Sequence, residues 1–337
     1  MSSRAKAWAR VFVEEAVREA PLVRHLLRRL PKARVVMIDH YQNVLGRGGQ
    51  DFWAQKRSPA LVLATARPPF LYAGNDFLQS AVSPNFRYTT PVLNCPYDCH
   101  YCYLQGLLAG ANPVVFVNTE DYFRAVESEL AALPTGAEPL HLALSYDTDL
   151  LALEGLFGLG AAWTEAFRGR EGLRIEIRTK AAPMRFLRET VPHDGVRLAW
   201  TLSPEPVARR YESGAPPLER RIAAMRAAAG AGWRLHLCLD PLLRLPDWQE
   251  MYEAFMERLR STLPWGAIDR VEIGVFRVSP DHFRRMRDRP RTDLLHYPYE
   301  HASTAVSYRE EERHELMEFV QKRLPESFSQ QQILLWT

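Results

Sequence analysis

Three of the four cysteines lie within eight residues, in the segment N-C-P-Y-D-C-H-Y-C-Y at 94–103. Cys95, Cys99 and Cys102 follow the spacing C-x3-C-x2-C. Three thiolates on one short loop can each hold one iron of a cubane cluster. Because such a cluster has four irons, one iron would lack a protein ligand, and an open coordination position can bind a small molecule. The spacing therefore predicts a [4Fe–4S] cluster with one iron free for a ligand.

Zinc is the alternative metal. Structural zinc sites use four ligands and commonly two C-x2-C pairs. His100 could supply a fourth ligand, but it lies between Cys99 and Cys102, where reaching the same metal is awkward. A third interpretation is that the thiols are unmetallated core residues. The loop directly follows the first expected strand of an α/β unit, which favours the cluster because catalytic loops occupy that end of the strands.

The elements that would position this loop follow from a regular alternation that begins near residue 88. We expect strands at 141–146, 173–179, 196–202, 233–239 and 270–276, and helices at 120–132, 151–168, 217–229 and 247–260. Strands alternating with helices predict a parallel sheet with βα crossovers. With the segment that leads into Cys95 there are about six units, too few for an eight-fold barrel. We therefore predict an α/β fold, a partial (β/α)6 TIM-type barrel with N-terminal and C-terminal extensions.

The regions on either side of the alternation are less regular. We expect residues 1–84 to be an N-terminal α/β extension that packs on a barrel formed by 85–280, with the Arg-rich part of this extension in one or two amphipathic surface helices. A helical pattern covers residues 11–30. Residues 281–337 would form a C-terminal segment with a basic stretch, a Tyr/His-rich part, a helix and a short apolar end.

The composition limits the class of protein. The chain has 337 residues, 47% of them hydrophobic, which is ample for a core. A net charge of +3 does not by itself indicate a nucleic-acid partner. No apolar run is long enough for a membrane span, and the N-terminus lacks the apolar part of a signal peptide. With four cysteines that do not suggest a disulfide framework, we expect a cytoplasmic protein.

The pattern C-x3-C-x-aromatic-C on a first βα loop resembles the signature of the radical S-adenosylmethionine (SAM) superfamily. The resemblance implies that Cys95, Cys99 and Cys102 hold the cluster and that the open iron binds the amino and carboxylate groups of SAM. Electron transfer would then cleave the sulfonium to give a 5′-deoxyadenosyl radical. Tyr101, the aromatic residue before the third cysteine, would pack against the adenine.

Longer segments are similar to the spore photoproduct lyase family: S-P-N-F-R-Y at 83–88, C-H-Y-C-Y-L-Q at 99–105, R-R-I-A-A-M-R-A-A-A-G-A-G-W at 220–233, and the ending Y-R-E-E-E…L-M-E…I-L-L-W-T. Members of this family repair a thymine dimer that UV light forms in DNA. The radical abstracts a hydrogen from the methylene bridge, the bridge fragments, and two thymines are restored. The resemblance implies DNA with a pyrimidine photolesion as a partner, and an external electron donor such as flavodoxin or ferredoxin.

Several polar residues match family positions. Lys180, in the strand end R-T-K, matches the lysine that contacts the SAM carboxylate, and an ammonium facing a carboxylate is sensible chemistry. Thr148, Thr201 and Ser203 match positions that hydrogen-bond SAM, and Tyr103 matches a tyrosine implicated in relaying the radical. The alternatives are an exposed strand-end lysine, ordinary strand-end hydroxyls, and a tyrosine that only packs near the cluster.

One family feature is missing. The family's hydrogen-donating cysteine lies three residues before an aspartate on the second strand, and Asp149 places Tyr146 at that position. Either the donor has moved or the reaction differs. Cys238 is the remaining cysteine, and strand alternation puts it on one face with His236. It is a relocated donor if that face points into the barrel, or else a small buried hydrophobe. The catalytic candidates are thus Tyr103, Tyr146 and Cys238.

Two further patterns have weaker interpretations. Asp147 and Asp149 could suggest a second metal, but we expect Asp149 to hydrogen-bond locally. The stretch 283–291 has five arginines, and with the aromatic residues that follow it offers cations and stacking faces for DNA, or else a solvated surface. These aromatic residues are His296, Tyr297, Tyr299, His301 and Tyr308. A lesion must leave the base stack to reach a radical, and such a segment would suit that task.

Three hypotheses remain. The first is a DNA photoproduct lyase, or a paralogue that acts on a related pyrimidine lesion. The second is a radical SAM enzyme with another substrate, such as a nucleoside, RNA or a peptide, which the missing cysteine supports. The third is a non-enzymatic nucleic-acid-binding protein with a structural Fe–S cluster, which would not cleave SAM.

Overall fold

A curled eight-stranded sheet is the centre of the computed structural model, which describes residues 8–74, 83–288 and 292–336. Its order is β18-β14-β13-β11-β10-β9-β5-β4. The parallel strands in chain order are β5 (Phe86–Tyr88), β9 (Leu140–Ala143), β10 (Leu173–Thr179), β11 (Val196–Thr201), β13 (Arg234–Leu242) and β14 (Ile268–Val275). β4 (Tyr72–Ala73) is antiparallel at one edge, and β18 (Ile333–Trp336) is parallel at the other. The predicted partial barrel is confirmed.

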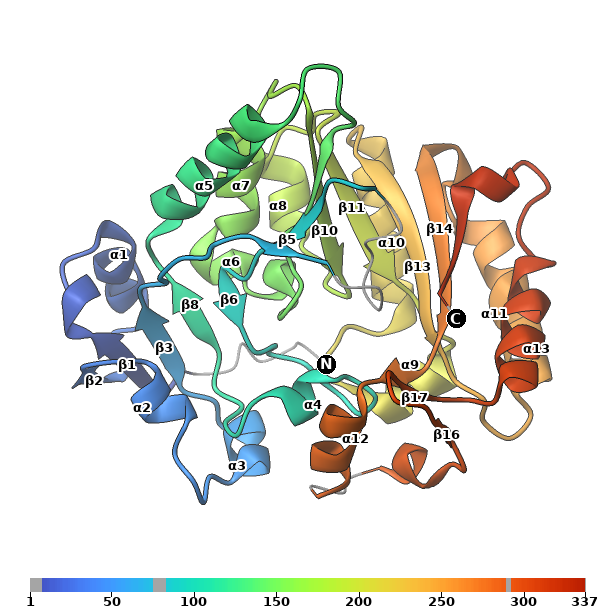
Figure 1. Cartoon of the computed structure of the whole chain (residues 1–337), viewed down its shortest axis with the longest axis horizontal. Helices are drawn as coiled ribbons and strands as arrows, with labels where there is room; N and C mark the ends of the chain where they lie inside the picture. Colours follow the sequence, from blue (N-terminus) through green and yellow to red (C-terminus); the bar gives the residue numbers. More distant parts are fainter. Residues whose placement is uncertain (1–7, 75–82, 289–291, 337) are drawn as a thin grey trace.

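Helices on one side of this sheet connect the strands (Figure 1). They are α5 (Thr119–Ala132), α6 (Glu154–Phe157), α7 (Leu159–Ala166), α8 (Met184–Glu189), α9 (Glu205–Tyr211), α10 (Leu218–Gly230) and α11 (Trp248–Thr262). The single helix expected at 151–168 is wrong. A 3-10 turn (Leu150–Ala152) and α6 come first, and Gly158, at φ 66°, separates α6 from α7. Glycine adopts this left-handed conformation at little cost, so it ends one helix before the next begins.

The strands of the barrel alternate between apolar and polar side chains. In β10, Leu173, Ile175 and Ile177 are buried, whereas Arg174, Glu176 and Arg178 between them line cavities. Successive side chains of a strand point to opposite faces of the sheet. The apolar face packs under the helices as the hydrophobic core, and the polar face forms the inside of the half-barrel.

A second, five-stranded sheet lies beside the barrel, with the order β2-β1-β3-β8-β6. Its strands are β1 (Arg10–Glu14), β2 (Arg34–Ile38), β3 (Leu61–Ala64), β6 (Val92–Leu93) and β8 (Val114–Phe116). The helical pattern expected over 11–30 is therefore wrong at its start. Val11 and Val13 are buried, β-branched and spaced by two, which suits a strand. The helix α1 (Pro21–Arg29) begins only at Pro21, a residue favoured in the first helical turn.

Both sheets combine strands from different parts of the proposed division into 1–84, 85–280 and 281–337. The five-stranded sheet takes β6 and β8 from the central part, and the barrel sheet takes β4 and β18 from the two extensions. The extensions thus share backbone hydrogen bonds with the centre. The division itself remains a prediction.

Shorter elements surround the open end of the barrel and complete the C-terminal segment. Before the first strand of the barrel lie α2 (Gln42–Leu45) and α3 (Phe52–Arg57), and between its first two strands lie β7 (Asp98–Cys99) and α4 (Leu104–Leu107). Within or after it lie β12 (Glu212–Ser213), β15 (Arg277–Val278), α12 (Pro280–Arg287), β16 (Glu300–His301), β17 (Val306–Ser307) and α13 (Glu310–Gln321).

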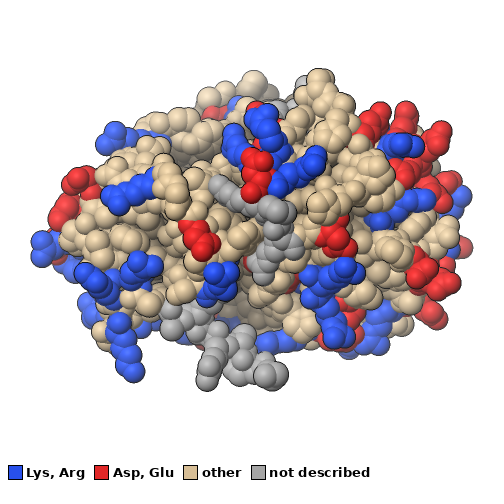
Figure 2. Space-filling view, turned by 90° about the horizontal axis from the view of Figure 1, so that it is seen from below, with Lys and Arg blue, Asp and Glu red and all other residues tan. Residues whose placement is uncertain are grey.

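Charge is unevenly distributed over the surface. Acidic side chains gather at the end of the molecule that carries α11 and α13, whereas basic side chains are spread over the rest of the face in Figure 2. The first turn of α13 contributes three glutamates. Among the described residues, no helix combines the length and apolar character that crossing a membrane requires.

Candidate active site

The cysteine loop is held from two sides. The Lys56 ammonium, from α3, donates hydrogen bonds to the carbonyls of Cys95 (2.9 Å) and Tyr97 (2.8 Å). Asn94, at φ 62°, donates from its side chain to the carbonyls of Gly110 (3.1 Å) and Asn112 (2.9 Å). On the far side, β7 pairs antiparallel with β12. These contacts fix the backbone from which the three cysteines project.

The three thiols are largely enclosed. Cys99 is buried, and Cys95 and Cys102 are half-buried. Burial raises the pKa of all three, that of Cys95 to about 11. Since a metal binds the thiolate, loading this loop would release protons.

The spacing of the sulfurs bears on which metal fits. Within the described part of the chain, the set of three ligand side chains whose atoms all lie within 4.8 Å of one another is Glu176, His236 and Glu272, and the cysteines form no such set. One tetrahedral zinc with Zn–S bonds of about 2.3 Å needs sulfurs only about 4 Å apart. At least one pair of the cysteine sulfurs is therefore more than 4.8 Å apart, which is farther than one zinc bound by all three would allow. The His100 ring packs against Tyr211, with 5.9 Å between ring centroids.

A buried carboxylate gathers three of the residues expected to contact SAM. Glu212 accepts hydrogen bonds from the hydroxyls of Tyr101 and Ser203, the latter at 2.9 Å. Lys180 lies with its ammonium 5.5 Å from the centroid of the Tyr101 ring. Arg221 and Glu212 form a fully buried ion pair at 2.5 Å. Burial alone would raise the pKa of Glu212, but Arg221 and Lys180 outweigh it and hold that pKa below its usual value.

The two threonines lie near the same loops. The hydroxyl of Thr148 donates to the carbonyl of Asn94 (2.9 Å), so it ties the end of the second barrel strand to the cysteine loop. Thr201 is buried at the end of β11, where its carbonyl accepts from Arg221 (3.4 Å).

Asp149 hydrogen-bonds locally, as expected, and also to the distant end of β10. Its carboxylate accepts from the Thr179 hydroxyl (2.7 Å) and from the backbone N–H of Lys180 (2.6 Å) and Ala152 (3.0 Å). It thereby fixes the strand end that carries Lys180. Asp147 is also engaged, since it accepts from Thr90 (2.7 Å) and Tyr103 (3.0 Å). Neither aspartate belongs to the one candidate metal group of the described residues.

A cavity of about 710 Å³ opens at the C-terminal ends of the strands. Tyr101 and Cys102 form part of its wall, and Tyr103 and Tyr146 form another part. The Tyr103 hydroxyl donates to the carbonyl of Tyr146 (2.9 Å), and their ring centroids are 6.2 Å apart. Tyr146 also packs on Tyr88 at 4.4 Å. The cysteine loop and Tyr146 therefore line the same cavity.

Cys238 lies on the inner face of β13, as the alternation with His236 predicts, but it is fully buried. The described residues that line the cavity include its neighbour Asp240 and not Cys238 itself. Burial raises the pKa of this thiol well above its usual value. The structure thus brings Tyr103 and Tyr146 together and leaves Cys238 beneath the cavity.

Two of the five C-terminal aromatic residues differ from expectation, whereas His296 and His301 are exposed and Tyr297 is half-buried. Tyr299 and Tyr308 are buried and pack on each other at 5.1 Å, so they belong to the core and offer no stacking face. His282 does line the cavity, because α12 packs closely on α4. A side chain at Gly106 would come within 2.4 Å of the His282 carbonyl oxygen. Of the basic stretch, residues 289–291 lie outside the described residues.

A family model described as spore photoproduct lyase matches residues 75–337. The chain belongs to the spore photoproduct lyase family. It is 25% identical over 184 residues to the spore photoproduct lyase of Bacillus subtilis (strain 168), covering 54% of this chain and 53% of that protein. It is 26% identical over 181 residues to that of Geobacillus sp. (strain Y412MC61), covering 52% of each. The chain thus spans about half the length of these curated relatives.

Solved structures of the same family share the fold. A spore photoproduct lyase complexed with dinucleoside spore photoproduct has a TM-score of 0.78 and 19% identity, covering 98% of this chain and 99% of that one. A double mutant with bound AdoMet and dinucleoside spore photoproduct has a TM-score of 0.77 and 19% identity, covering 98% of each chain. The likeness in fold extends over nearly the whole chain.

Sequence reasoning missed the buried residues that hold the cysteine loop and the expected SAM-binding side chains in place. Lys56, Glu212 and Arg221 are buried polar residues whose partners come from distant segments. No local pattern marks such contacts. The charged inner face of the barrel did leave a signal, because R-I-E-I-R in β10 and H-L-C-L-D in β13 alternate polar and apolar residues.

Proposed function

We propose that the chain is a radical SAM lyase that reverses a UV-induced thymine dimer in DNA, either spore photoproduct or a related pyrimidine lesion. The observation that carries this proposal is the cavity that Cys102 and Tyr101 share with Tyr103 and Tyr146. Family membership supports it, and so do relatives described with bound AdoMet and dinucleoside spore photoproduct.

In this proposal, Cys95, Cys99 and Cys102 hold a [4Fe–4S] cluster. The enclosure of their thiols and their place on a loop fixed by Lys56 fit such a group. When bound and reduced, the cluster would supply one electron to the sulfonium of SAM, whose cleavage gives methionine and a 5′-deoxyadenosyl radical.

The chain's own residues would bind and orient SAM. Glu212 holds the Tyr101 hydroxyl, which fixes the ring for packing on the adenine. Lys180 offers an ammonium to the SAM carboxylate. Ser203 and Thr148 hold the surrounding loops by donating to Glu212 and to the Asn94 carbonyl, and their hydroxyl oxygens would keep lone pairs that accept from SAM. Thr201, at the end of β11, would add a third hydroxyl.

We assign hydrogen donation to Tyr146. It lines the cavity, whereas Cys238 is fully buried below it. Its phenol would give a hydrogen atom to a carbon radical and become a tyrosyl radical. Tyr103 would restore it by passing on its own hydrogen atom, and the Asp147 carboxylate, which accepts from the Tyr103 hydroxyl, would hold that hydroxyl in place. The radical left on Tyr103 would end by taking a hydrogen atom from 5′-deoxyadenosine, or an electron from the external donor with a proton from solvent.

A second candidate is a radical SAM enzyme with a different substrate, such as a nucleoside, RNA or a peptide. Tyr146 supports it, because a tyrosine stands where the family has its donor cysteine. Under the first proposal, the partners are damaged DNA and an electron donor such as flavodoxin or ferredoxin, and the protein works in the cytoplasm.

The test is anaerobic reconstitution of the cluster, reduction, and addition of SAM with purified dinucleotide spore photoproduct. Mass spectrometry would follow 5′-deoxyadenosine and restored thymine. Restored thymine supports the lyase. Deoxyadenosine without restored thymine, with this and other pyrimidine dimers, supports the second candidate. No deoxyadenosine from a fully loaded cluster would contradict both.

A further inference from the structure

A second cavity, of about 310 Å³, lies at the opposite end of the half-barrel from the cysteines. Its walls come from residues near the starts of the strands, among them His141 of β9, Arg174 of β10 and Arg270 of β14. Glu176 and Ala143 line both this lower cavity and the larger upper one. The lower cavity therefore adjoins the proposed active site without containing any of its cysteines.

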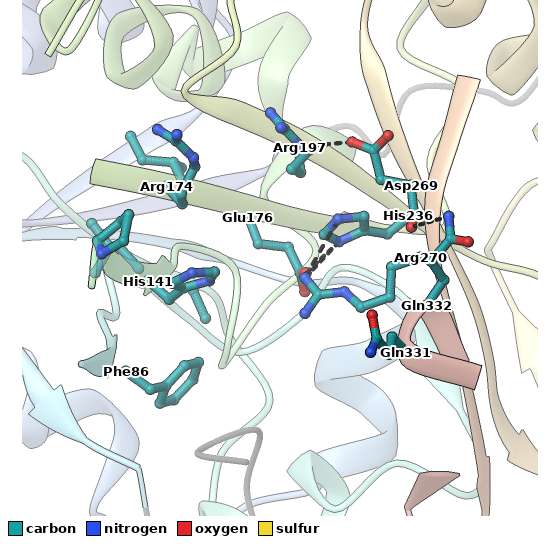
Figure 3. Close-up of a pocket in the computed structure, with 14 residues that line it drawn as sticks. Phe86, His141, Arg174, Glu176, Arg197, His236, Asp269, Arg270, Gln331 and Gln332 are labelled. Atoms are coloured by element: carbon teal, nitrogen blue, oxygen red, sulfur yellow. Dashed lines mark hydrogen bonds and ion pairs between the residues drawn. The ribbon is translucent and has the colours of Figure 1, made fainter. Parts of the chain in front are cut away.

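The acidic residues of this cavity are already neutralised. Glu176 accepts from His236 (2.8 Å) and from Arg270 (3.2 Å). Asp269 pairs with Arg197 (2.9 Å) and also with Arg234. Figure 3 shows the contacts of Glu176 with His236 and Arg270, and the pair of Asp269 with Arg197. Each carboxylate thus has two basic partners, which leaves little of its charge to repel an anion.

Arg174 differs from the other arginines. Among the residues that the structure describes, no carboxylate lies within 4.0 Å of its guanidinium, and its hydrogen bond goes to the carbonyl of its neighbour Leu173 (3.0 Å). A guanidinium has five N–H donors in a planar fork. With respect to the described residues, most of the donors of Arg174 therefore have no partner at the wall of the cavity.

The lining has an excess of positive charge. Three guanidiniums, those of Arg174, Arg197 and Arg270, line the cavity together with two carboxylates, those of Glu176 and Asp269. Burial and the nearby Arg270 lower the pKa of His141 to about 4, so its imidazole is neutral at pH 7 and serves as a hydrogen-bonding group. A small anion with several oxygens would match this arrangement.

A metal ion matches it less well. Glu176, His236 and Glu272 have ligand atoms within 4.8 Å of one another. However, Arg178 and Arg270 pair with both of these glutamates. A divalent cation would have to displace two guanidiniums from a network whose charges already balance.

We propose that the lower cavity is a binding site for a small phosphate-bearing molecule, with Arg174 as its main anchor and Arg197 and Arg270 beside it. Arginine forks bind phosphate oxygens in pairs, which favours phosphate over a simple halide. The volume lies at the lower end of that of ligand pockets and suits a free phosphate or a compact phosphate ester. The ligand would be distinct from SAM and from the lesion.

The experiment is calorimetric titration of the full-length, cluster-loaded chain with inorganic phosphate and with ribose 5-phosphate, at constant ionic strength set with sodium chloride. We expect saturable binding of at least one of them. Arg174→Gln should weaken it roughly tenfold or more, because a charge-assisted pair is lost. Arg174→Lys should give an intermediate loss, since it keeps the charge without the fork. Arg188→Gln, on the exposed face of α8, is the matched control and should bind as the parent does.

The two ligands distinguish the sources of the phosphate. Binding of ribose 5-phosphate but not phosphate would support a phosphate ester, and the reverse would support the free ion. The proposal would be overturned if neither ligand binds, or if folded Arg174→Gln binds as well as the parent. Binding of zinc in place of phosphate, with loss in His236→Gln, would also overturn it.

Discussion

The two ends of the half-barrel are built from the same strands but differ in which elements supply the side chains that line their cavities. At the C-terminal ends, loops between strands and helices carry the cysteines and tyrosines around a cavity of about 710 Å³. At the N-terminal ends, the strands themselves provide charged side chains around a cavity of about 310 Å³. Glu176 lines both. The comparison teaches that the cysteines and tyrosines come from loops held by buried polar contacts, whereas the charged side chains of the lower end come mainly from the alternation of side chains along the strands.

The largest effect should come from removing a cluster ligand at the upper end. Cys99→Ala should abolish formation of 5′-deoxyadenosine, because two cysteines cannot hold the cluster that the three are proposed to hold. Iron content per chain and mass spectrometry of deoxyadenosine measure this. Phosphate titration of the same variant should remain unchanged, which would separate the two ends. Full activity in Cys99→Ala would refute the assignment of the cluster.

Next in size is the buried ion pair behind the upper cavity. Arg221→Met leaves the Glu212 carboxylate buried without its main partner and should lower the free energy of unfolding by about 3–5 kcal/mol. Denaturant unfolding measures this. Arg210→Met is the matched control, because Arg210 pairs with Asp293 at the surface, and it should cost at most about 1 kcal/mol. Equal losses in the free energy of unfolding of the two variants would contradict the prediction that the buried pair contributes more to stability than the exposed one.

Tyr146→Phe tests which residue donates the hydrogen atom at the upper end. It should lower the rate of thymine restoration by about a hundredfold, the size typical of losing one catalytic hydrogen-transfer group, while deoxyadenosine formation persists. Cys238→Ala should restore thymine at nearly the parent rate, because that side chain is outside the cavity lining. The opposite ranking of the two variants would move the donor to Cys238.

The smallest effect concerns the lower end and depends on pH. The pKa of His141 is about 4 in the folded chain and 6.5 in its unperturbed form. Between these values the unfolded chain binds more protons, so the free energy of unfolding should fall as the pH decreases from 6.5 toward 4. Solvent screening of this partly exposed group limits its share to about 1–2 kcal/mol. The difference in stability between pH 7 and pH 5 should shrink in His141→Gln, and an unchanged difference would contradict this.

Local patterns were sufficient for the strands and long helices of the barrel. Alternation in β10 and the apolar spacing of α10 and α11 depend on neighbours in sequence, and these elements lie where they were expected. The same reasoning misplaced residues 10–14, where a strand pattern of two buried valines merges into a helical one. It also predicted one helix where α6 and α7 are separate, because the spacing of hydrophobic residues does not show the left-handed backbone conformation of Gly158.

By itself, the sequence determined the α/β barrel, the C-x3-C-x2-C loop and the family, because these rest on periodicity and on spacing within short segments. Only the tertiary structure decided which side chains meet. Lys56 reaches the cysteine loop, Arg221 reaches Glu212, and Tyr146 faces the cavity while Cys238 does not. The physical reason is that such contacts join segments far apart in the chain, and their positions follow from how strands and helices pack rather than from any local preference.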